Sequence, residues 1–402
     1  MTAVAVGPVK PIPFSRTVIT SKARLAASRV MASGWVTTGP EVTAFEAELA
    51  QWVGATYAVG VSSCTAAIEI ALRALRLPPN SPVLISTLTF CGAIHAIVHA
   101  GHRPVLVDID PQNLMPSPVT IAVAAGHRPQ AMVALHYGGH GAALLESAKA
   151  AGLPMSRIVE DAAHAIGTEI GGKRVGGFSA ATCFSFYATK NLPIGEGGMI
   201  TTDDADLASE ARRLRLHGMS DDAWRRYMPG GSWRYSVAGD GIKANMTDVQ
   251  ASIGRVQLRS LEAWQGRREK LAMAYDAGLE RIPGIRLPAR PIDGRHAWHL
   301  YVVRVGPDFG MGRDELMSAL AEQGIYSSVH FIPNHTQPYF RRFLDAEASY
   351  PNADAAFNEI LSLPFYPSLT MGEVDRVCDA IARCCAARRR GKPTLWRNEV
   401  VA

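Results

Sequence analysis

The sequence predicts an α/β fold, with a mostly parallel sheet in a three-layer large domain (residues 1–250) and a smaller α+β domain (251–387). In the first half of the chain, short strands that are apolar nearly throughout alternate with helical stretches, which is typical of a parallel sheet covered on both faces. Near residue 247 a long helical pattern replaces this alternation. A length of 402 residues also suits two domains. Residues 388–402 are expected to form a loosely ordered basic tail.

The N-terminal region is predicted to begin with two helices, at residues 17–34 and 41–53, joined by a loop. The second is amphipathic, with apolar side chains recurring on one face. A short apolar strand at 57–61 follows. The next residues, Ser-Ser-Cys-Thr at 62–65, open a helix that runs to residue 75, because serine and threonine hydroxyls can cap its first turn.

Six further strands are expected to build the sheet, with helical stretches between most of them. Their ranges are 82–86, 104–108, 131–135, 157–160, 181–186 and 198–202. The smaller domain is expected to start with one long helix from 248 to about 282. Two strands at 299–305 and 326–331 should flank a helix at 313–323, and a last helix should cover 371–387.

Composition and charge exclude several classes of function. The formal net charge is +5, and much of the basic excess lies near the C-terminus. Nucleic-acid binding needs a concentrated basic stripe, so this mild excess instead suits small anionic substrates. No apolar run approaches the ~20 residues that span a bilayer, and the first residues lack the pattern of a secretory signal. We therefore expect a cytoplasmic protein without nucleic-acid or membrane partners.

Cysteine and histidine patterns predict no metal site. The six cysteines show no metal-binding or redox spacing, so free thiols in a reducing compartment are the plain interpretation. His95, His99 and His102 share helical spacing, but no carboxylate completes a set of metal ligands.

The strongest chemical signal is an aspartate and a lysine that each follow an apolar strand. Asp161 belongs to Val-Glu-Asp-Ala-Ala-His at 159–164, and Lys190 belongs to Phe-Ser-Phe-Tyr-Ala-Thr-Lys-Asn at 184–191, ahead of a glycine-rich turn. Open α/β sheets place ligands at the carboxyl ends of their strands. Pyridoxal-phosphate (PLP) chemistry needs such a pair, because a lysine forms a Schiff base and a carboxylate keeps the pyridine nitrogen protonated. Taken singly, each residue is better explained as a helix cap or a surface lysine; the pair favours catalysis.

A second signal is a candidate phosphate site at the turn between the strand at 57–61 and the helix after it. Backbone N–H groups at such a turn attract anions, and Ser63 and Thr65 add hydroxyl donors. Taken alone, this segment is better explained by simple helix capping. Together with Ser185 it completes a candidate phosphate cup.

With these motifs, the chain resembles the DegT/DnrJ/EryC1/StrS sugar aminotransferases, a PLP-dependent family of fold-type I. The resemblance extends from Ser-Gly-Trp at 33–35 to Ser-Leu-Pro-Phe-Tyr-Pro at 362–367, and the segments 160–164 and 184–191 are its most specific parts. It implies a homodimeric enzyme that moves an amino group from an amino acid, L-glutamate, onto a keto-sugar nucleotide by a ping-pong mechanism.

The resemblance also assigns roles to the motif residues. Lys190 would hold PLP and then move a proton between substrate and cofactor, while Asp161 would pair with the pyridine nitrogen. His164 would lie near the ring hydroxyl, and Phe90 would stack on the ring face. The residues that would contact the phosphate within one subunit are Ser63, Cys64, Thr65 and Ser185.

Two positions bear further on the phosphate site. Asn245 would reach the phosphate of the neighbouring subunit, so that activity would require the homodimer. The family usually has glycine where this chain has Cys64, and a side chain there could crowd the loop, because glycine permits backbone angles that cysteine disfavours. We expect the loop to tolerate it.

Within the family, the segments 243–248 and 330–339 are similar to the enzyme that aminates UDP-4-keto-arabinose, which implies a 4-keto sugar. By that likeness His330 would help position the donor carboxylate, and His335 and Arg234 are assigned to substrate binding as well. A structural histidine at a strand end or in a loop explains His330 and His335 equally well. The loop around Arg234 suits a pyrophosphate, but an ordinary exposed loop fits it equally.

Two alternatives differ from this function. A few relatives are PLP-dependent sugar dehydratases, but these carry histidine in place of the lysine that stands at position 190 here. The other alternative is a non-catalytic, PLP-binding regulatory protein, although nothing resembles a DNA-binding helix-turn-helix. The sugar, its nucleotide and the aminated carbon, C3 or C4, stay open.

Overall fold

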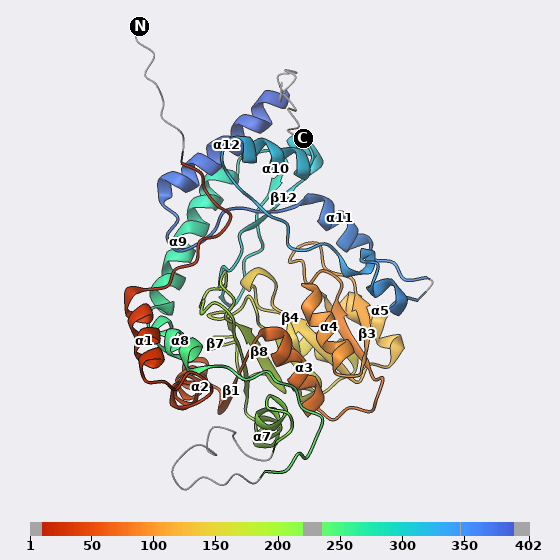
Figure 1. Cartoon of the computed structure of the whole chain (residues 1–402). Helices are drawn as coiled ribbons and strands as arrows, with labels where there is room; N and C mark the ends of the chain where they lie inside the picture. The colour runs from red at the N-terminus through yellow and green to blue at the C-terminus, as the bar shows by residue number, and fades with distance from the viewer. Residues whose placement is uncertain (1–9, 220–234, 346, 390–402) are drawn as a thin grey trace, which may run out of the picture.

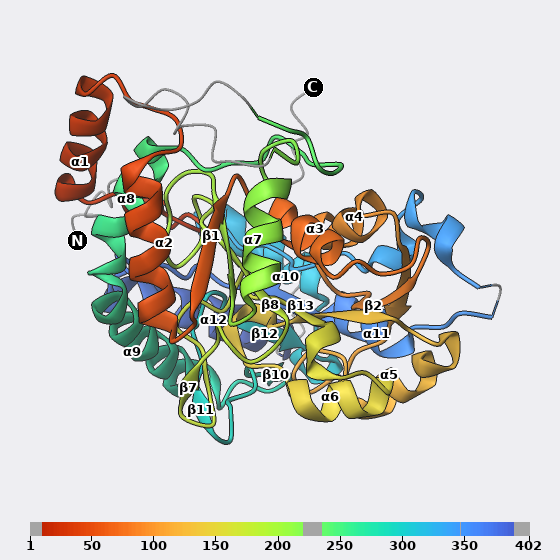
Figure 2. The same cartoon turned by 90° about the horizontal axis from the view of Figure 1, so that it is seen from below.

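The computed structural model describes residues 10–219, 235–345 and 347–389. Figures 1 and 2 show a central sheet with helices around it, and a second group of helices and short strands formed by the C-terminal part of the chain. This arrangement confirms the predicted α/β fold class with a mostly parallel sheet.

The main sheet has seven strands in the order β1-β9-β8-β5-β4-β2-β3. Their bounds are β1 Tyr57–Val61, β2 Pro82–Ser86, β3 Arg103–Val107, β4 Ala131–Leu135, β5 Ile158–Asp161, β8 Ala181–Ser185 and β9 Gly198–Thr202. The pairs β2–β3, β2–β4, β4–β5 and β5–β8 are parallel, whereas β9 pairs antiparallel with β1 and β8. Each predicted strand of this sheet lies within one residue of its expected bounds.

The two faces of the sheet pack against different helices. In β2, Val83 and Ile85 belong to one apolar cluster, whereas Leu84, which points to the opposite side, belongs to another. The helices of the first cluster are α3 (Cys64–Ala74), α4 (Cys91–His99), α7 (Ala205–Leu214) and α11 (Pro351–Glu359). Those of the second are α5 (Pro118–Ala124) and α6 (Leu144–Ala151). Strands that are apolar on both sides therefore match a sheet that is covered on both faces.

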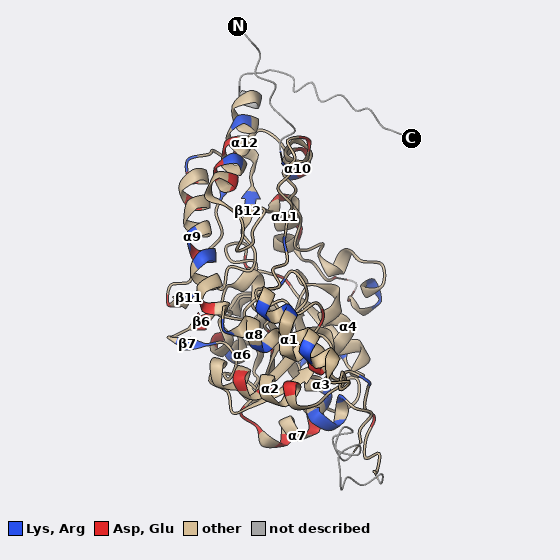
Figure 3. Ribbon diagram, turned by 60° about the vertical axis from the view of Figure 1, so that its left-hand side comes forward, with Lys and Arg blue, Asp and Glu red and all other residues tan. Residues whose placement is uncertain are grey.

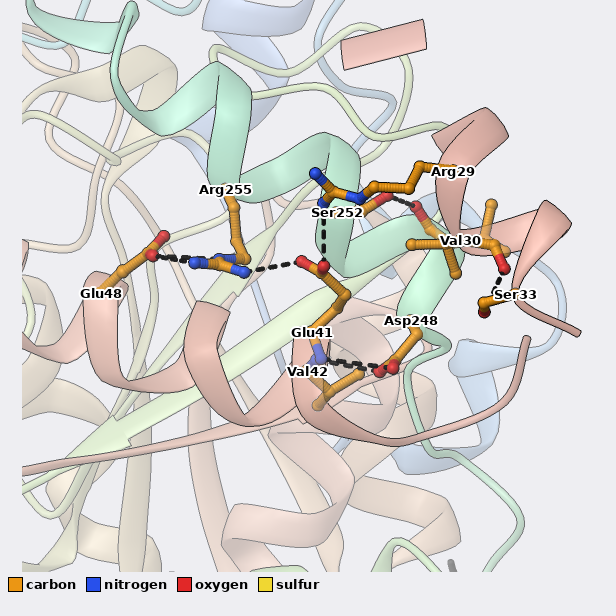
Figure 4. A network of polar contacts seen from close by, with 10 residues as sticks. Arg29, Val30, Ser33, Glu41, Val42, Glu48, Asp248, Ser252 and Arg255 are labelled. Atoms are coloured by element: carbon orange, nitrogen blue, oxygen red, sulfur yellow. Dashed lines mark hydrogen bonds and ion pairs between the residues drawn. The ribbon is translucent and has the colours of Figure 1, made fainter. Parts of the chain in front are cut away.

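Three helices far apart in the sequence pack together: α1 (Ser21–Ala32), α2 (Pro40–Val53) and α8 (Asp248–Leu258). Figure 4 shows the polar network that joins them. Arg255 of α8 lies 2.6 Å from Glu48 and 2.7 Å from Glu41, both on α2. Arg29 of α1 lies 3.0 Å from the same Glu41. One carboxylate thus links all three helices.

The first turn of α2 is capped by a residue from another helix. Its N-cap is Gly39, which has no side chain to accept a hydrogen bond. The carboxylate of Asp248 instead accepts from the backbone N–H of Glu41 at 3.2 Å and of Val42 at 3.0 Å (Figure 4). A Cβ on Gly39 would lie 2.7 Å from that carboxylate, so glycine leaves the room that this cap requires.

The C-terminal part of the chain forms a second apolar core. Its helices are α9 (Leu261–Leu279), α10 (Arg313–Glu322) and α12 (Met371–Arg389). They accompany an antiparallel sheet of β10 (Ile285–Arg286), β12 (Val302–Val305) and β13 (Ile360–Ser362). A third small sheet joins β11 (Gly294–Arg295) to β6 (Glu169–Ile170) and β7 (Lys173–Arg174).

The helices of this part differ from the expected ones at two points. The single helix expected at 248–282 is in fact two helices, because the N–H of Ser260 donates to the carbonyl of Gln257 and closes a tighter turn between α8 and α9. The last helix, α12, continues to Arg389, two residues into the expected tail. The remainder of that tail lies outside the described residues.

The two strands expected in this part are also corrected. The strand expected at 299–305 begins only at Val302, since the N–H groups of His299 and Leu300 donate to the Gly138 carbonyl, at 2.9 and 3.1 Å. The strand expected at 326–331 makes one isolated bridge, between Ser328 and Ser362. The first segment thus begins at the turn after β4, and the second adds a single bridge to β13 of the small sheet.

Acidic and basic side chains are interspersed over the helices that Figure 3 shows. Many of these charges form ion pairs, as the contacts of Arg255 illustrate. Among the described helices, none combines the length and the apolar character needed to cross a membrane.

Candidate active site

A cavity of about 480 Å³ opens at the carboxyl ends of β1, β5 and β8. Loops that follow parallel strands meet at one edge of the sheet, so residues distant in sequence converge there. Of the predicted site residues, those that line this cavity are Ser63, Cys64, Thr65, Phe90, Asp161, His164, Ser185, Lys190 and His330. A second cavity, of about 470 Å³, lies between β3, α5 and residues 343–345 and 347–350, and its lining includes no predicted site residue.

The cavity floor includes the N-terminus of α3, where backbone N–H groups and the helix dipole favour an anion. Ser63 is the N-cap of this helix, and its hydroxyl accepts from the N–H of Ala66 at 3.1 Å. The simple capping interpretation is therefore correct for the Ser63 hydroxyl, which nevertheless lies on the cavity wall. Thr65 and Ser185 bring further hydroxyl groups to the same wall.

Glycine at the start of β9 allows the loop before α3 to approach the sheet. A Cβ on Gly198 would lie 2.5 Å from the carbonyl carbon and oxygen of Ser63 and 2.8 Å from the backbone nitrogen of Cys64. No side chain fits there without displacing the loop. The glycine-rich turn after Lys190 thus helps to shape the anion site.

Asp161 is the last residue of β5, and its side chain is buried beneath the cavity. One carboxylate oxygen accepts from the N–H of Ala163 at 3.1 Å and lies 3.8 Å from the Cys64 sulfur. Within the described residues the other oxygen has no hydrogen-bond partner. Burial raises the pKa of Asp161, while the Ala163 N–H and the charge of Lys190 oppose that rise. This oxygen is suited to a cationic N–H donor in the cavity.

Lys190 follows β8 and lies half-buried across the cavity from this carboxylate. Burial lowers the pKa of its amine to about 8, although the charges of Asp161 and Cys64 act in the opposite direction. A substantial fraction of the amine is therefore neutral near physiological pH. Only the neutral amine can attack a carbonyl carbon, so this environment activates Lys190 as a nucleophile.

His164 lies in the cavity as a neutral ring with a defined tautomer. The N–H of Gly138 donates to its Nδ1 at 3.2 Å, which leaves the ring proton on Nε2. Burial lowers the pKa of His164 well below its ordinary value, and the charge of Lys190 adds to this effect. Its ring centroid lies 4.5 Å from that of His299 and 5.8 Å from that of Phe331.

Phe90 presents an aromatic face at the cavity, with 58% of its surface exposed. Such exposure is unusual for a large apolar ring in a folded chain and leaves it able to stack on a ligand. Gly92 supports this position, because a Cβ there would lie 2.7 Å from the Thr65 hydroxyl and 3.0 Å from the Phe90 ring.

His330 also reaches the cavity and carries no charge at neutral pH. Burial lowers its pKa to about 4. Its Nδ1 lies 2.8 Å from the Ser362 hydroxyl, and its ring stacks on Phe14 with centroids 5.3 Å apart. The Tyr137 hydroxyl donates to its backbone carbonyl. His330 can therefore take part in hydrogen bonds with a ligand, but it does not offer a positive charge.

The remaining predicted residues do not line this cavity. His335 contacts the Thr87 hydroxyl at 2.9 Å and Asp354 at 2.9 Å, which is the kind of arrangement that the structural interpretation of this histidine expects. The side-chain amide of Asn245 donates to the Thr38 hydroxyl at 2.6 Å, away from the cavity of its own subunit. Arg234 lies outside the described residues.

The backbone at Cys64 does not adopt the angles that only glycine permits easily, so the cysteine causes no strain of this kind in the loop. It is the first residue of α3, and its φ is not positive. Its sulfur lies 3.3 Å from the Cys183 carbonyl and 3.8 Å from Asp161, so the side chain packs into the sheet rather than into the anion site. Burial raises the pKa of this thiol well above its ordinary value.

Several cavity residues were missed from the sequence. His299 lines the wall beside His164, and Phe331, Tyr187 and Glu196 complete it. His299 follows Trp298, which adopts a φ of +48° and turns the chain toward the sheet. Its apolar neighbours indicated an ordinary strand, so only a motif comparison could have identified it.

The donor set fits PLP. Lys190 offers an amine to an aldehyde, Asp161 offers an unpaired carboxylate oxygen to a pyridine N–H, and the N-terminus of α3 offers N–H groups to a phosphate. Phe90 supplies an aromatic face for the ring.

Comparison with known proteins agrees with this fit. Residues 18–382 match the model of the DegT/DnrJ/EryC1/StrS aminotransferase family. The spore coat polysaccharide biosynthesis protein SpsC of Bacillus subtilis is 44% identical over 376 residues, which cover 92% of this chain and 96% of SpsC.

Solved structures show the same likeness. The aminotransferase TlmJ from Streptoalloteichus hindustanus is 32% identical, with a TM-score of 0.85 over 94% of this chain and 99% of TlmJ. DesV of S. venezuelae, solved in complex with a ketimine intermediate, is 34% identical, with a TM-score of 0.84 over 94% and 99%. Spr1654 of Streptococcus pneumoniae, solved in a PLP form, is 28% identical, with a TM-score of 0.85 over 94% and 99%. The chain therefore belongs to the DegT/DnrJ/EryC1/StrS aminotransferase family, and its cofactor is pyridoxal 5'-phosphate.

Proposed function

We propose that this aminotransferase moves the amino group of L-glutamate to a nucleotide-linked 4-keto sugar by a ping-pong mechanism. The observation that carries the proposal is the pairing of Lys190, whose pKa is lowered to about 8, with the unpaired oxygen of Asp161 across one cavity. In this cavity PLP supplies an aldehyde that joins amines and a ring that accepts electrons.

In this proposal Lys190 acts twice. Its neutral amine would hold the cofactor covalently. Once displaced by an amino acid, the same amine would take a proton from the α-carbon of that amino acid and return one to the cofactor carbon that the lysine had held, since a pKa of about 8 suits both directions. The surrounding burial keeps water from competing for that proton.

The other cavity residues position the cofactor. Asp161 would pair with the pyridine N–H, and His164 would offer its Nε2 proton to the ring hydroxyl. Phe90 would stack on the ring face. The phosphate would be held at the start of α3 and the end of β8, by Ser63, Cys64, Thr65 and Ser185.

The sugar substrate is proposed from the family and from the volume of the site. SpsC is described as a protein of spore coat polysaccharide biosynthesis, which supports a sugar acceptor here. The segments that resemble the UDP-4-keto-arabinose enzyme support amination at C4. His330 is proposed to hydrogen-bond the donor, whereas Arg234 is proposed to meet the pyrophosphate of the sugar nucleotide.

A homodimer is proposed to complete each site. The location of Asn245, outside the cavity of its own subunit, supports a contact with the phosphate in the other subunit. In a symmetric dimer each subunit would then supply its Asn245 to the site of the other subunit.

The proposal is tested by supplying the loaded enzyme with L-glutamate and a panel of 4-keto and 3-keto sugar nucleotides. We expect an amino sugar and 2-oxoglutarate in equal amounts, with double-reciprocal rate plots that stay parallel as the second substrate is varied. Product from the 3-keto sugars alone would contradict C4 amination. Intersecting plots would contradict the ping-pong order.

A further inference from the structure

A third, much smaller cavity lies beside the active-site cavity, and Lys190 lines both of them. Its volume is about 10 Å³, which is about the room that one water molecule occupies. It lies between the N-terminal segment 15–18, the loop 188–191, α9 and residues 366–367. Thr189 and Lys190 line both this cavity and the active-site cavity. A ligand that projects past Lys190 would therefore enter it.

Arg268 lines the small cavity as a buried cation, and no carboxylate among the described residues forms an ion pair with it. It is 3% exposed, and its Nη1 donates to the Trp298 carbonyl at 2.9 Å. Its Nε is buried and has no hydrogen-bond partner within the described residues. Burial lowers the pKa of Arg268 to about 9, so the guanidinium stays protonated at neutral pH. A buried, partly unsatisfied cation is costly unless an anion joins it.

Tyr366 adds a second unsatisfied donor to the same cavity. It is 1% exposed, and its hydroxyl also has no partner within the described residues. The guanidinium of Arg16 lies 5.5 Å from the centre of its ring, at the exposed side of the cavity. In the described part of the chain Arg16 forms no hydrogen bond or ion pair.

The charge around this cavity is one-sided. Its lining includes Arg16, Lys190 and Arg268 but no aspartate or glutamate. The charge of Arg16 acts on Glu373 and helps to lower its pKa. The Glu373 carboxylate accepts from the Thr370 backbone at 2.8 Å and from the Thr370 hydroxyl at 3.0 Å. That carboxylate is engaged at the start of α12 and does not line the cavity.

We propose that this cavity is the subsite for the α-carboxylate of the amino donor, held by Arg268, the Tyr366 hydroxyl and Arg16. The inference rests on the proposed aminotransferase function. The α-carboxylate is one bond from the carbon whose proton Lys190 moves, so its subsite must adjoin Lys190. The pyrophosphate of a sugar nucleotide is separated from the reacting carbon by the sugar ring and does not meet this condition.

Entry of a carboxylate requires more room than the cavity has in this structure. Movement of either of two parts of its lining, Lys190 or the N-terminal segment 15–18, would enlarge it. Lys190 lines both cavities, so a movement of its side chain changes the room in each of them. The N-terminal segment 15–18 contacts the loop 188–191 through a hydrogen bond from the Thr17 hydroxyl to the Ala188 carbonyl at 2.7 Å.

The test compares Tyr366→Phe and Arg16→Gln with the wild type in the donor half-reaction alone. Neither change removes a hydrogen bond seen in the structure, so both variants should fold. We expect the L-glutamate concentration that gives half-maximal conversion of the cofactor spectrum to rise about tenfold in each, because each loses a hydrogen bond to a charged group. The limiting rate should change little. Tyr326→Phe and Arg341→Gln serve as matched controls, because both lie outside the two cavities and neither side chain forms a hydrogen bond within the described residues.

A binding measurement separates this inference from the proposed function. Glutarate keeps both carboxylates of glutamate but has no amine, so calorimetry with the PLP-loaded enzyme reports the subsite without any reaction. We expect glutarate to bind about tenfold more weakly to both variants than to the wild type. If no amino acid converted the wild-type spectrum, the donor function would fail, while weaker glutarate binding would still support the subsite.

Unchanged glutarate affinity and unchanged half-maximal glutamate concentration in both variants would overturn the subsite. A second outcome would also overturn the subsite. If chloride raised the unfolding temperature of the wild type but not of a variant, and that variant kept its glutarate affinity, the cavity would hold an inorganic anion instead of the donor carboxylate.

Discussion

At the scale of single residues, function depends on Lys190 being less basic than an ordinary lysine. Burial lowers the pKa of its amine to about 8, and the opposing charge of Asp161 does not restore it. His164, His299 and His330 are kept neutral by burial as well. The cavity thus contains several hydrogen-bonding rings but few permanent charges, which keeps the electrostatic effect of Asp161 on Lys190 strong.

The pH dependence of cofactor uptake follows from this shift. An ordinary lysine stays mostly protonated until about pH 10. Because only the neutral amine attacks the aldehyde, the rate at which apoenzyme takes up PLP should rise with pH and level off above about pH 8, the pKa of Lys190. Stopped-flow absorbance measures this rate. A range from about pH 6 to about pH 10 separates a lysine pKa of about 8 from the ordinary lysine pKa. A rate that keeps rising to the upper limit would show an unperturbed lysine.

At the scale of elements, the anion site depends on the close approach of β9 to the start of α3. Gly198→Ala places a Cβ 2.5 Å from the Ser63 carbonyl group, so the loop must move. We expect the dissociation constant for PLP to rise about tenfold or more, as misplaced charge-assisted hydrogen bonds would require. Equilibrium dialysis measures it. Gly312→Ala is the control, since nothing lies within 4 Å of its Cβ position, and its PLP affinity should match the wild type.

The long-range cap of α2 makes a separate prediction about stability. Asp248→Ala removes the acceptor for the N–H groups of Glu41 and Val42, which have no local side-chain cap. We expect the free energy of unfolding to fall by about 1–2 kcal/mol, the usual cost of losing a helix cap. Urea denaturation measures the change. Asp379→Ala, at an exposed position of α12, should alter it by less than about 0.5 kcal/mol; equal losses in the two variants would contradict the cap.

The elements of the large domain could be predicted because their signals are local. Strands that are apolar on both sides, and hydroxyl caps such as Ser63, depend on a few adjacent residues. The break between α8 and α9 could not be predicted, because Arg259 and Ser260 are neither glycine nor proline. The side chain of Gln257, whose carbonyl closes the turn, bonds to Thr20 and Pro193, which are distant in the sequence. The same holds for 326–331, whose strand-like pattern lines the active site rather than a sheet.

The candidate site was predictable where a motif carried it. Asp161 and Lys190 each end a recognisable strand, and both line the cavity. His335 shares a segment with His330, yet it bonds to Thr87 and Asp354, since one segment can pass from a cavity into a packed interior within five residues. Arg268 gave no signal, because its significance depends on unsatisfied groups that only the folded chain brings together.

At the scale of the whole molecule, the active site is proposed to be shared between two copies of the chain. Asn245 then serves the partner's cavity, while Lys190 serves its own. Inactive Lys190→Ala and Asn245→Ala proteins should regain activity when they are mixed, because a mixed dimer contains one site with both native residues. Random exchange of subunits gives about a quarter of the wild-type activity in a symmetric dimer.

Activity of the mixture at two or more ratios, after subunit exchange, measures this effect. Each variant mixed with itself is the control. A mixture no more active than its parts would contradict the shared site, and a monomeric mass in light scattering would contradict the dimer itself.

The most direct test of the central claim is the absorbance spectrum of the protein with PLP, recorded before and after addition of L-glutamate, for the wild type and for Lys190→Ala. The account predicts a visible band in the wild type that depends on Lys190 and that glutamate removes, because the amino acid takes over the cofactor carbon that the lysine held. A wild-type protein that shows no such band when PLP is supplied would contradict the account, and so would a Lys190→Ala protein that glutamate converts at the wild-type rate.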